Sequence, residues 1–385
     1  MVSHARDLFT KSFGSDPQSV SRAPGRVEVL GNHTDYNEGY VLSCSIDRAV
    51  FAAASRSSDE DGFGFVSSQF PEVVRVGDPA RKSEQKWIAY PLGVYAVLKQ
   101  GGYPVGPFRL AVHGDIPIGG GLSSSAALEV STALCLGDLF GFEIEPVDMA
   151  KICQRAENEF VGANCGLLDQ FSSLLAEKNR LLFIDFRSLS YRTIPLPADN
   201  ICVAVTMSGV THTLAESAYN DRRRECAAAA DYFASVNPNV KTLRDVTMDM
   251  IVAHQDRLEP DTLKRARHVV GENERVLSGI GHLEQGALRE FGRILYRSHE
   301  SSRLNFENSC DELDTLVGIA RTVEGVYGSR LTGGGFGGAT LAILDIAAKE
   351  RFEKTIIAEY KKATGRDTVV HFASVAEGAG MVNEA

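Results

Sequence analysis

The sequence predicts an α+β protein. Two observations carry this prediction: strand-like and helical stretches are mixed without a strict strand–helix–strand alternation, and a long, mostly helical region at 213–305 interrupts the strands. Strict alternation would instead predict a doubly wound parallel sheet. With 385 residues, of which 44% are hydrophobic, the chain is long enough for two domains with substantial cores.

The elements follow from hydrophobic periodicity and from the positions of turn-forming residues. In the first half, the expected strands are 26–30, 41–54, 107–113, 181–186 and 191–194. The expected helices of that half are 85–99, 123–140 and 147–160. In the second half, we expect strands at 201–207, 329–331, 339–344 and 368–373, and a helix at 347–363 besides the helical region.

The loop Pro-Leu-Pro-Ala-Asp-Asn at 195–200 is the best candidate linker, because two prolines and two turn-forming residues lie between strand-like runs. It predicts an N-terminal lobe at 1–197 and a C-terminal lobe at 198–385. The boundary is open by tens of residues, since either lobe can borrow a terminal segment of the chain.

Composition excludes several classes of protein. The net charge of −10 argues against a nucleic-acid partner. No apolar run approaches the roughly 18–20 residues that span a membrane, and the polar N-terminus lacks a signal-peptide core. Seven irregularly spaced cysteines argue against a disulfide framework or a zinc site. We expect a soluble cytoplasmic protein; the sequence leaves the oligomeric state open, and a monomer is one option.

Residues 119–127, Gly-Gly-Gly-Leu-Ser-Ser-Ser-Ala-Ala, join a glycine cluster to the start of an expected helix. Glycines let backbone N–H groups approach a ligand, and a helix N-terminus presents unpaired N–H groups and the positive end of the helix dipole. The pattern indicates a phosphate site; a tight turn with Ser123 as the helix cap is the competing interpretation. No Gly-Lys-Ser/Thr follows, which excludes a Walker-type P-loop.

Four other segments carry polar groups or glycines. The loop at 23–37 is rich in hydrogen-bonding side chains, which suits a polyol ligand or an Asx-rich turn. Glu157 and Asp169 flank a glycine-containing connection, as candidate metal ligand and acid/base or as solvated charges. Tyr219 is either a half-buried aromatic or a ligand-contacting hydroxyl. At 333–338, five glycines in six positions favour a backbone role, such as close approach to a phosphate or to another loop.

Three motifs in order resemble those of galactokinases in the GHMP small-molecule kinase superfamily. They are residues 25–37, from Gly-Arg-Val to Asp-Tyr-Asn, residues 117–126, Pro-Ile-Gly-Gly-Gly-Leu-Ser-Ser-Ser-Ala, and residues 331–338, Leu-Thr-Gly-Gly-Gly-Phe-Gly-Gly. The resemblance covers nearly the whole chain. It implies a two-lobed fold with the active site in the cleft between the lobes, and an ATP-dependent sugar 1-kinase that makes α-D-galactose 1-phosphate.

The resemblance also implies roles by position. The ATP phosphates would be held by Gly119, Gly120, Gly121, Leu122, Ser123, Ser124, Ser125 and Ala126. Trp87 and Tyr90 would lie near the nucleotide base, and Glu157 with Ser125, or its neighbour Ser124, would bind Mg²⁺. Asp169 matches the catalytic aspartate beside the anomeric hydroxyl, and Arg26 its charged partner. The implied sugar-contacting positions are Asn32, His33, Asp35, Gly166 and Tyr219.

These roles agree with the demands of phosphoryl transfer, which are mainly positioning and charge neutralisation. Asp169 would accept the proton of the sugar O1 as the bond to phosphorus forms, while Arg26 keeps that carboxylate ionised. Alternatively, Asp169 mainly orients the hydroxyl, because a loose transition state needs little assistance from a base.

Asn32 departs from the family pattern. Galactokinases usually read Gly-Glu-His-Thr-Asp-Tyr, and that glutamate accepts a hydrogen bond from the O6 hydroxyl of the sugar. An amide oxygen still accepts, but without charge assistance, which weakens the contact by about 1 kcal/mol. Asn32 also removes a negative charge that would repel a carboxylate at C6.

Galactose is therefore the leading substrate, and galacturonate, N-acetylgalactosamine and other galactose relatives are alternatives. A non-catalytic sensor of galactose and ATP belongs to a different class of function. The intact serine run at 123–125 and the presence of Asp169 argue against it. The mevalonate and homoserine kinase branches are disfavoured by the loop from His33 to Tyr36.

Overall fold

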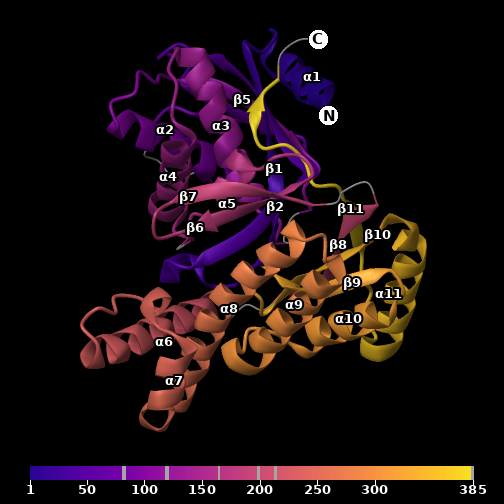
Figure 1. Ribbon diagram of the computed structural model, residues 1–385. Helices are drawn as coiled ribbons and strands as arrows, with labels where there is room; N and C mark the ends of the chain where they lie inside the picture. The colour runs from indigo at the N-terminus through magenta and orange to yellow at the C-terminus, as the bar shows by residue number, and fades with distance from the viewer. Residues whose placement is uncertain (80–83, 118–120, 164, 197–199, 212–214, 383–385) are drawn as a thin grey trace.

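The computed structural model describes residues 1–79, 84–117, 121–163, 165–196, 200–211 and 215–382 (Figure 1). Within these ranges the strands form two sheets. The larger has eight strands in the order β12-β1-β2-β5-β3-β4, with β6 paired to β2 and β7 to β6. Its strands are β1 (Ser19–Leu30), β2 (Tyr40–Arg56), β3 (Phe63–Ser67), β4 (Phe70–Val76), β5 (Phe108–Gly114), β6 (Arg180–Asp185), β7 (Ser190–Pro195) and β12 (Gly380–Met381). Among the strand pairs of the described ranges, only β3 and β5 are parallel.

Helices cover both faces of the larger sheet, because alternate residues of β2 point to opposite sides. Ala52 and Ala54 belong to a core shared with α3, whereas Phe51 and Ala53 pack with Ala5 and other residues of α1. The helices of this half are α1 (Val2–Phe13), α2 (Ala89–Gln100), α3 (Ser124–Phe140), α4 (Pro146–Ala156) and α5 (Leu168–Leu175). A π-helical turn, Glu157–Val161, extends α4.

The smaller sheet is antiparallel, with the order β11-β8-β10-β9. Its strands are β8 (Ile201–Thr211), β9 (Val326–Thr332), β10 (Gly337–Asp345) and β11 (Val370–Ala373). One face packs on α10 (Asp311–Thr322) and α11 (Lys349–Thr364), and the other joins the large core together with α9 (Leu288–Ser301). α6 (Ala215–Val236) and α7 (Met248–His254) pack beside α8 (Pro260–Glu284), at the lower left of Figure 1.

The sheets change between β7, which ends at Pro195, and β8, which begins at Ile201. The expected lobe boundary at 197 lies in this interval, although residues 197–199 themselves lie outside the described ranges. The C-terminus crosses back, because β12 pairs with β1 and Val375 bridges to Ile46. The expected lobes are therefore tied together by the last segment of the chain.

Every strand and helix expected from the sequence is present, several of them longer than expected. One element differs in type of helix: the last turn of the expected helix at 147–160 is π-helical. The sequence analysis missed α1, β3, β4, α5, α10 and β12. Most of these are short elements, and α1 is a helix with a polar surface, so they give a weak periodic signal. α10 is different: its buried residues Leu313, Leu316, Val317 and Ala320 have helical spacing, so the signal was present in the sequence.

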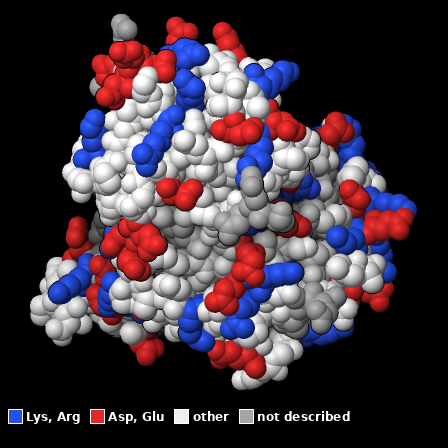
Figure 2. Space-filling model, turned by 90° about the horizontal axis from the view of Figure 1, so that it is seen from above, with Lys and Arg blue, Asp and Glu red and all other residues white. Residues whose placement is uncertain are grey.

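The surface carries charges of both signs. On the face in Figure 2, acidic and basic side chains are interspersed. In the arginine run at 222–224, Arg222 has a structural contact: it donates from Nε to the Phe306 carbonyl at 2.7 Å. All seven cysteines have free thiols. Among the described residues, no helix is long and apolar enough to cross a membrane.

Candidate active site

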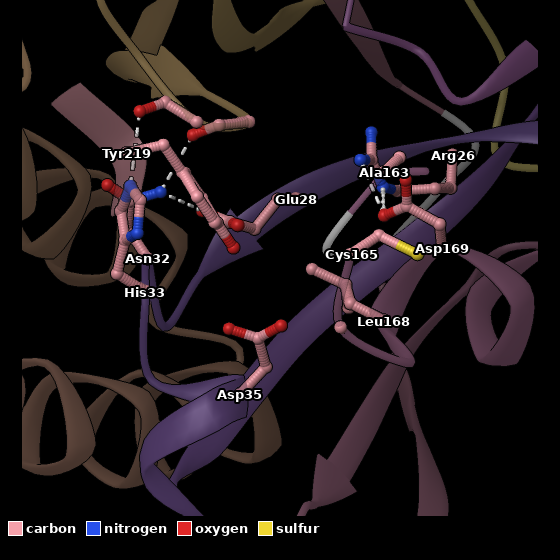
Figure 3. Close-up of a pocket in the computed structure, with 13 residues that line it drawn as sticks. Arg26, Glu28, Asn32, His33, Asp35, Ala163, Cys165, Leu168, Asp169 and Tyr219 are labelled. Carbon is pink, nitrogen blue, oxygen red and sulfur yellow. Dashed lines mark hydrogen bonds and ion pairs between the residues drawn. The ribbon is translucent and has the colours of Figure 1, made fainter. Parts of the chain in front are cut away.

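A cavity of about 310 Å³, which we call the polar cavity, is lined by residues from both halves of the chain (Figure 3). Its walls are Arg26, Glu28, Asn32, His33, Asp35, Ala163, Cys165, Gly166, Leu168, Asp169, Tyr219, Gly333 and Gly334. All five residues implied to contact a sugar are among them, as are both members of the implied catalytic pair. A concave site with many converging polar groups suits a small polyhydroxylated ligand.

Arg26 and Asp169 form one end of the polar cavity. Arg26, buried on β1, donates from Nε to Asp169 Oδ1 at 2.8 Å, and its Nη2 lies 2.6 Å from the same oxygen. Its Nη1 donates to the Gly121 carbonyl at 2.6 Å, and the Ser123 hydroxyl donates to Asp169 Oδ2 at 2.5 Å. Asp169 lies in the first turn of α5, where the helix dipole favours a negative charge. The ion pair therefore touches the loop that was expected to bind phosphate.

Asn32 lies at the other end of the polar cavity, in the loop that follows β1 (Figure 3). Its Nδ2 donates to the Gly333 carbonyl at 2.8 Å and to Glu28 Oε1 at 2.9 Å. Its Oδ1 accepts a hydrogen bond from Asn308 Nδ2 at 2.9 Å. The second glycine cluster thus approaches another loop, which was one of the two roles expected for it.

His33 is held beside Asn32 with both ring nitrogens in contacts. Nε2 lies 3.1 Å from the Gly334 carbonyl, and Nδ1 lies 2.8 Å from the Tyr36 hydroxyl. A carbonyl only accepts, so Nε2 carries the proton and Nδ1 accepts from the tyrosine. Burial lowers the pKa of His33 to about 3, so the ring is neutral at physiological pH. Its backbone lies in the left-handed region with φ 61°, which is uncommon outside glycine.

A buried carboxylate from α8 fixes the backbone of the same loop. Glu272 Oε2 accepts hydrogen bonds from the N–H groups of Gly31 at 3.0 Å and Asn32 at 3.2 Å. Burial opposes ionisation of Glu272, but the positive charges of Arg275 and Arg330 hold its pKa well below the usual range. The second half of the chain thereby sets the position of a loop from the first half.

Asp35 and Gly166 lie directly against each other in the wall of the polar cavity. Asp35 begins a 3₁₀ turn, and burial, aided by the negative charge of Asp169, raises its pKa to about 6. A Cβ at Gly166 would overlap Asp35 Oδ2, so only glycine fits there. Tyr219, on α6, lies with its ring centroid 5.1 Å from that of His33, and burial raises its pKa.

A second cavity, of about 300 Å³, begins at the N-terminus of α3 and is called here the aromatic cavity. Its walls are Val50, Ser67, Gln69, Phe70, Trp87, Tyr90, Val112, Gly114, Ile116, Ser124, Ser125 and Leu128. The rings of Phe70 and Trp87 are nearly parallel, with centroids 6.5 Å apart. The residues expected near a nucleotide base therefore share a cavity with the serines expected near its phosphates.

The described part of the expected phosphate loop, residues 121–126, leads into α3. Gly119 and Gly120 lie outside the described residues. The buried Leu122 accepts a hydrogen bond from the backbone N–H of Arg26 at 3.1 Å, and Ala126 is buried in the first helical turn. Ser123 precedes the helix with φ 57°, a strained conformation of the kind that clusters at functional sites.

The expected metal ligands are brought together. Ser125 lies close enough to Glu157 to lower the pKa of that carboxyl, and Glu157 Oε2 accepts a hydrogen bond from Gln170 Nε2 at 3.0 Å. Burial raises the pKa of Glu157, and the negative charge of Asp169 raises it further. Hard oxygen donors beside carboxylates that repel each other suit Mg²⁺, which in kinases takes one or two protein ligands plus phosphate oxygens.

The sequence analysis did not single out Glu28, Ala163, Cys165 and Leu168, of which Glu28 and Cys165 bring polar groups to the polar cavity. Cys165 Sγ donates to Glu157 Oε2 at 3.2 Å and so joins the polar cavity to the expected metal site. Glu28 lies between Val27 and Val29 in β1 and is 5% exposed. A carboxylate within an apolar strand is costly to bury unless it has a partner or a function, and this was the signal in the sequence.

Family models match three parts of the chain. Residues 7–56 match the galactokinase galactose-binding signature, residues 89–177 the N-terminal domain of GHMP kinases, and residues 280–362 the GHMP kinase C-terminal domain. The galactokinase of Roseiflexus sp. (strain RS-1) is 39% identical over 98% of this chain and 96% of its own length. The galactokinase of Thermotoga maritima is 37% identical over 93% and 98%, respectively.

Solved structures of known proteins are also similar to this chain. The structure of Lactococcus lactis galactokinase complexed with galactose matches with a TM-score of 0.92 and 30% identity, covering 98% of this chain and 99% of that one. A mevalonate kinase, at 17% identity and a TM-score of 0.62, shares the fold alone. Fold and site together define a GHMP kinase, which is an ATP-dependent phosphotransferase. Within that superfamily, the chain belongs to the galactokinase family.

Proposed function

We propose that this protein transfers the γ-phosphoryl group of ATP to the C1 hydroxyl of D-galactose, giving α-D-galactose 1-phosphate and ADP. One observation carries the proposal: the Arg26–Asp169 pair lies in the polar cavity and contacts Gly121 and Ser123, the loop at the start of α3. A hydroxyl bound at this pair would lie beside phosphates bound at the helix N-terminus.

We propose that the two cavities divide the substrates. The polar cavity would hold galactose, with Asp35 accepting hydrogen bonds from O3 and O4, and with Asn32, His33, Gly166 and Tyr219 shaping the remaining wall. The aromatic cavity would hold the nucleotide, with the base near Trp87 and Tyr90 and the phosphates against residues 119–126. Lobes at 1–197 and 198–385 would enclose the sugar between them.

In the chemical step, Asp169 would accept the proton of the C1 hydroxyl as O1 forms its bond to the γ-phosphorus and the bond from phosphorus to the bridging oxygen of ADP breaks. Arg26 balances the charge of Asp169 and fixes its orientation through two contacts to one oxygen. The hydroxyl of Ser123 holds the other oxygen, so the carboxylate is oriented before the sugar arrives.

We propose Ser125 and Glu157 as the residues that hold Mg²⁺. The ion would supply positive charge to the phosphate oxygens during transfer. The contact of Ser125 with Glu157 and the mutual repulsion of Glu157 and Asp169 support this assignment.

ADP release from Mg²⁺-ATP tests the proposal directly, with galactose, galacturonate, N-acetylgalactosamine and glucose as acceptors. We expect strong preference for galactose and a product phosphorylated at C1, identified by phosphorus NMR. Preference for another sugar would overturn the substrate assignment. Binding of galactose and ATP without turnover would instead indicate a sensor.

A further inference from the structure

Glu28 presents a carboxylate oxygen to the polar cavity. It lies on β1, 5% exposed, and its Oε1 accepts hydrogen bonds from Asn32 Nδ2 at 2.9 Å and from Arg330 Nη1 at 3.2 Å. Its other oxygen, Oε2, accepts no hydrogen bond from the residues that the structure describes. A buried carboxylate with one oxygen unused, on the wall of a cavity, is ready to accept a hydrogen bond from a ligand.

The arginine next to Glu28 does not by itself explain this carboxylate. Arg330 is fully buried, and its Nη1 also contacts the Val29 carbonyl at 3.3 Å, while Nε and Nη2 have no hydrogen-bond partner within the described part of the chain. If Glu28 served only as its counter-ion, a two-pronged pair using both oxygens would satisfy both groups better. Instead, Oε2 of Glu28 has no hydrogen bond from the described residues and is available to a ligand in the polar cavity.

Asn32, by contrast, has no capacity left for a ligand. Both N–H groups of its side chain donate, to Glu28 and to the Gly333 carbonyl. Its oxygen accepts from Asn308 at 2.9 Å and makes a long contact of 3.5 Å with the Ser302 hydroxyl. Turning the amide over would face its oxygen towards two acceptors, so this orientation is fixed by its partners.

The positions of the charged groups match the outline of the sugar. Arg26 and Glu28 lie on one face of β1, about 6.6 Å apart along the strand. In a hexopyranose, O1 and O6 lie on the same edge, on either side of the ring oxygen, and O3 and O4 lie on the opposite edge. Arg26, Asp169, Asp35 and Glu28 surround the polar cavity (Figure 3). With O1 at the Arg26–Asp169 pair and O3 and O4 at Asp35, the C6 group would come to Glu28.

We propose that Glu28, and not Asn32, reads the group at C6 of the sugar. Its Oε2 accepts the hydrogen bond of the O6 hydroxyl, and its negative charge excludes sugars that carry a carboxylate at C6. Asn32 is a positioning residue that holds Oε1 of Glu28. This inference rests on the proposed function, because it assumes that galactose binds with O1 at Asp169, and it removes galacturonate from the candidate substrates.

Calorimetric binding of galactose and of 6-deoxygalactose, which lacks O6, tests the inference in the wild type and in Glu28→Gln. We expect the wild type to bind galactose at least about tenfold more tightly, because a hydrogen bond to a carboxylate is charge-assisted. In Glu28→Gln, this preference falls by about tenfold while 6-deoxygalactose binds as before. Glu274→Gln, an exposed glutamate on α8, is the matched control and keeps the wild-type ratio.

A swapped pair provides a second test that does not depend on the first variant. Asn32→Glu alone places a second carboxylate against Glu28 and the Gly333 carbonyl, and Glu28→Asn alone leaves no carboxylate there. The double variant restores one amide and one carboxylate in hydrogen-bonding contact. We expect both single variants to lose galactose affinity and the double variant to recover part of it, a coupling that independent sites do not show.

The inference is overturned if Glu28→Gln keeps the wild-type ratio, or if the double variant binds galactose no better than the weaker single variant. Turnover separates these outcomes from the proposed function. If the wild type binds galactose more tightly than 6-deoxygalactose but releases no ADP, recognition of the C6 group is supported and the proposed kinase activity is contradicted. A wild type that phosphorylates galactose without discriminating by O6 supports the kinase alone.

Discussion

The polar cavity and the aromatic cavity differ both in their walls and in the origin of those walls. Carboxylates, an arginine and amide groups line the polar cavity, and they come from both halves of the chain. Mainly rings and aliphatic side chains line the aromatic cavity, with Gln69 and three serines, all from residues before 129. Directional polar groups discriminate between similar ligands better than apolar surfaces do. We therefore expect the specificity for the sugar to come from the polar cavity, which both halves of the chain build.

The contrast extends to how the walls are held. The loop at 31–36 is fixed by Glu272, Asn308 and the carbonyls of Gly333 and Gly334, all from the second half. The walls of the aromatic cavity, by contrast, all come from the first half of the chain. Substitutions should therefore separate cleanly: those in the polar cavity change sugar kinetics, and those in the aromatic cavity change ATP kinetics.

The largest expected effect comes from Asp169→Ala. We expect kcat to fall by about 10²- to 10⁴-fold, the range of general-base contributions, because the C1 hydroxyl loses both its proton acceptor and its orientation. Sugar binding by calorimetry should largely survive. Asp148→Ala, an exposed aspartate on α4, is the control. Near-normal turnover in Asp169→Ala would remove this residue from the chemistry.

Asp35→Ala tests the role of the polar cavity in sugar binding. Loss of a carboxylate that accepts from two hydroxyls should raise the KM for galactose by about 10- to 100-fold. The KM for ATP should stay within about twofold, since Asp35 does not line the aromatic cavity. Initial rates with each substrate varied in turn give both constants. An unchanged KM for galactose would contradict the placement of O3 and O4.

Trp87→Ala tests the role of the aromatic cavity in nucleotide binding. Loss of a ring that stacks near the base should raise the KM for ATP by about two- to tenfold, with the KM for galactose unchanged. The same initial-rate design measures it. A change in the KM for galactose equal to that for ATP would show that the two cavities are not independent.

The smallest expected effect is a change with pH in the preference for galactose over galacturonate. Burial raises the pKa of Glu28 to about 7, against the charges of Arg330 and Arg26 and the hydrogen bond from Asn32, and with a small contribution from Asp35. Lowering the pH from 8 to 6 protonates Glu28 and removes its repulsion of a C6 carboxylate. The kcat/KM ratio of galactose to galacturonate should therefore fall by a few-fold. In Glu28→Gln, this pH dependence should be flat; a slope equal to that of the wild type would assign the titration elsewhere.

The sequence predicted the strands and helices with strong periodicity, and the motifs placed the candidate residues in two groups that the structure brings together. Arg26 and Asp169, 143 positions apart, are in contact. Ser125 and Glu157 also meet. The roles assigned to these residues stay predictions until the variants above are measured.

What the sequence did not reveal depends on contacts between distant segments. The hydrogen bonds of Asn32 with Gly333 and Asn308 join positions about 300 and 280 residues apart, and no local pattern encodes them. For this reason, Asn32 was interpreted alone, as a weaker copy of the family glutamate, while the carboxylate four residues earlier was overlooked. The return of β12 to the first sheet is hidden in the same way, because two residues give no periodic signal.

A crystal structure with bound galactose tests most directly whether the polar cavity binds the sugar through O1, O3, O4 and O6. We predict galactose in this cavity with O1 within hydrogen-bonding distance of Asp169, O3 and O4 at Asp35, and O6 at Oε2 of Glu28. An O6 hydroxyl bound to the amide of Asn32, with Asn32 released from Gly333, would contradict the role given to Glu28. Galactose bound with O1 away from Asp169 would contradict the proposed transfer to C1.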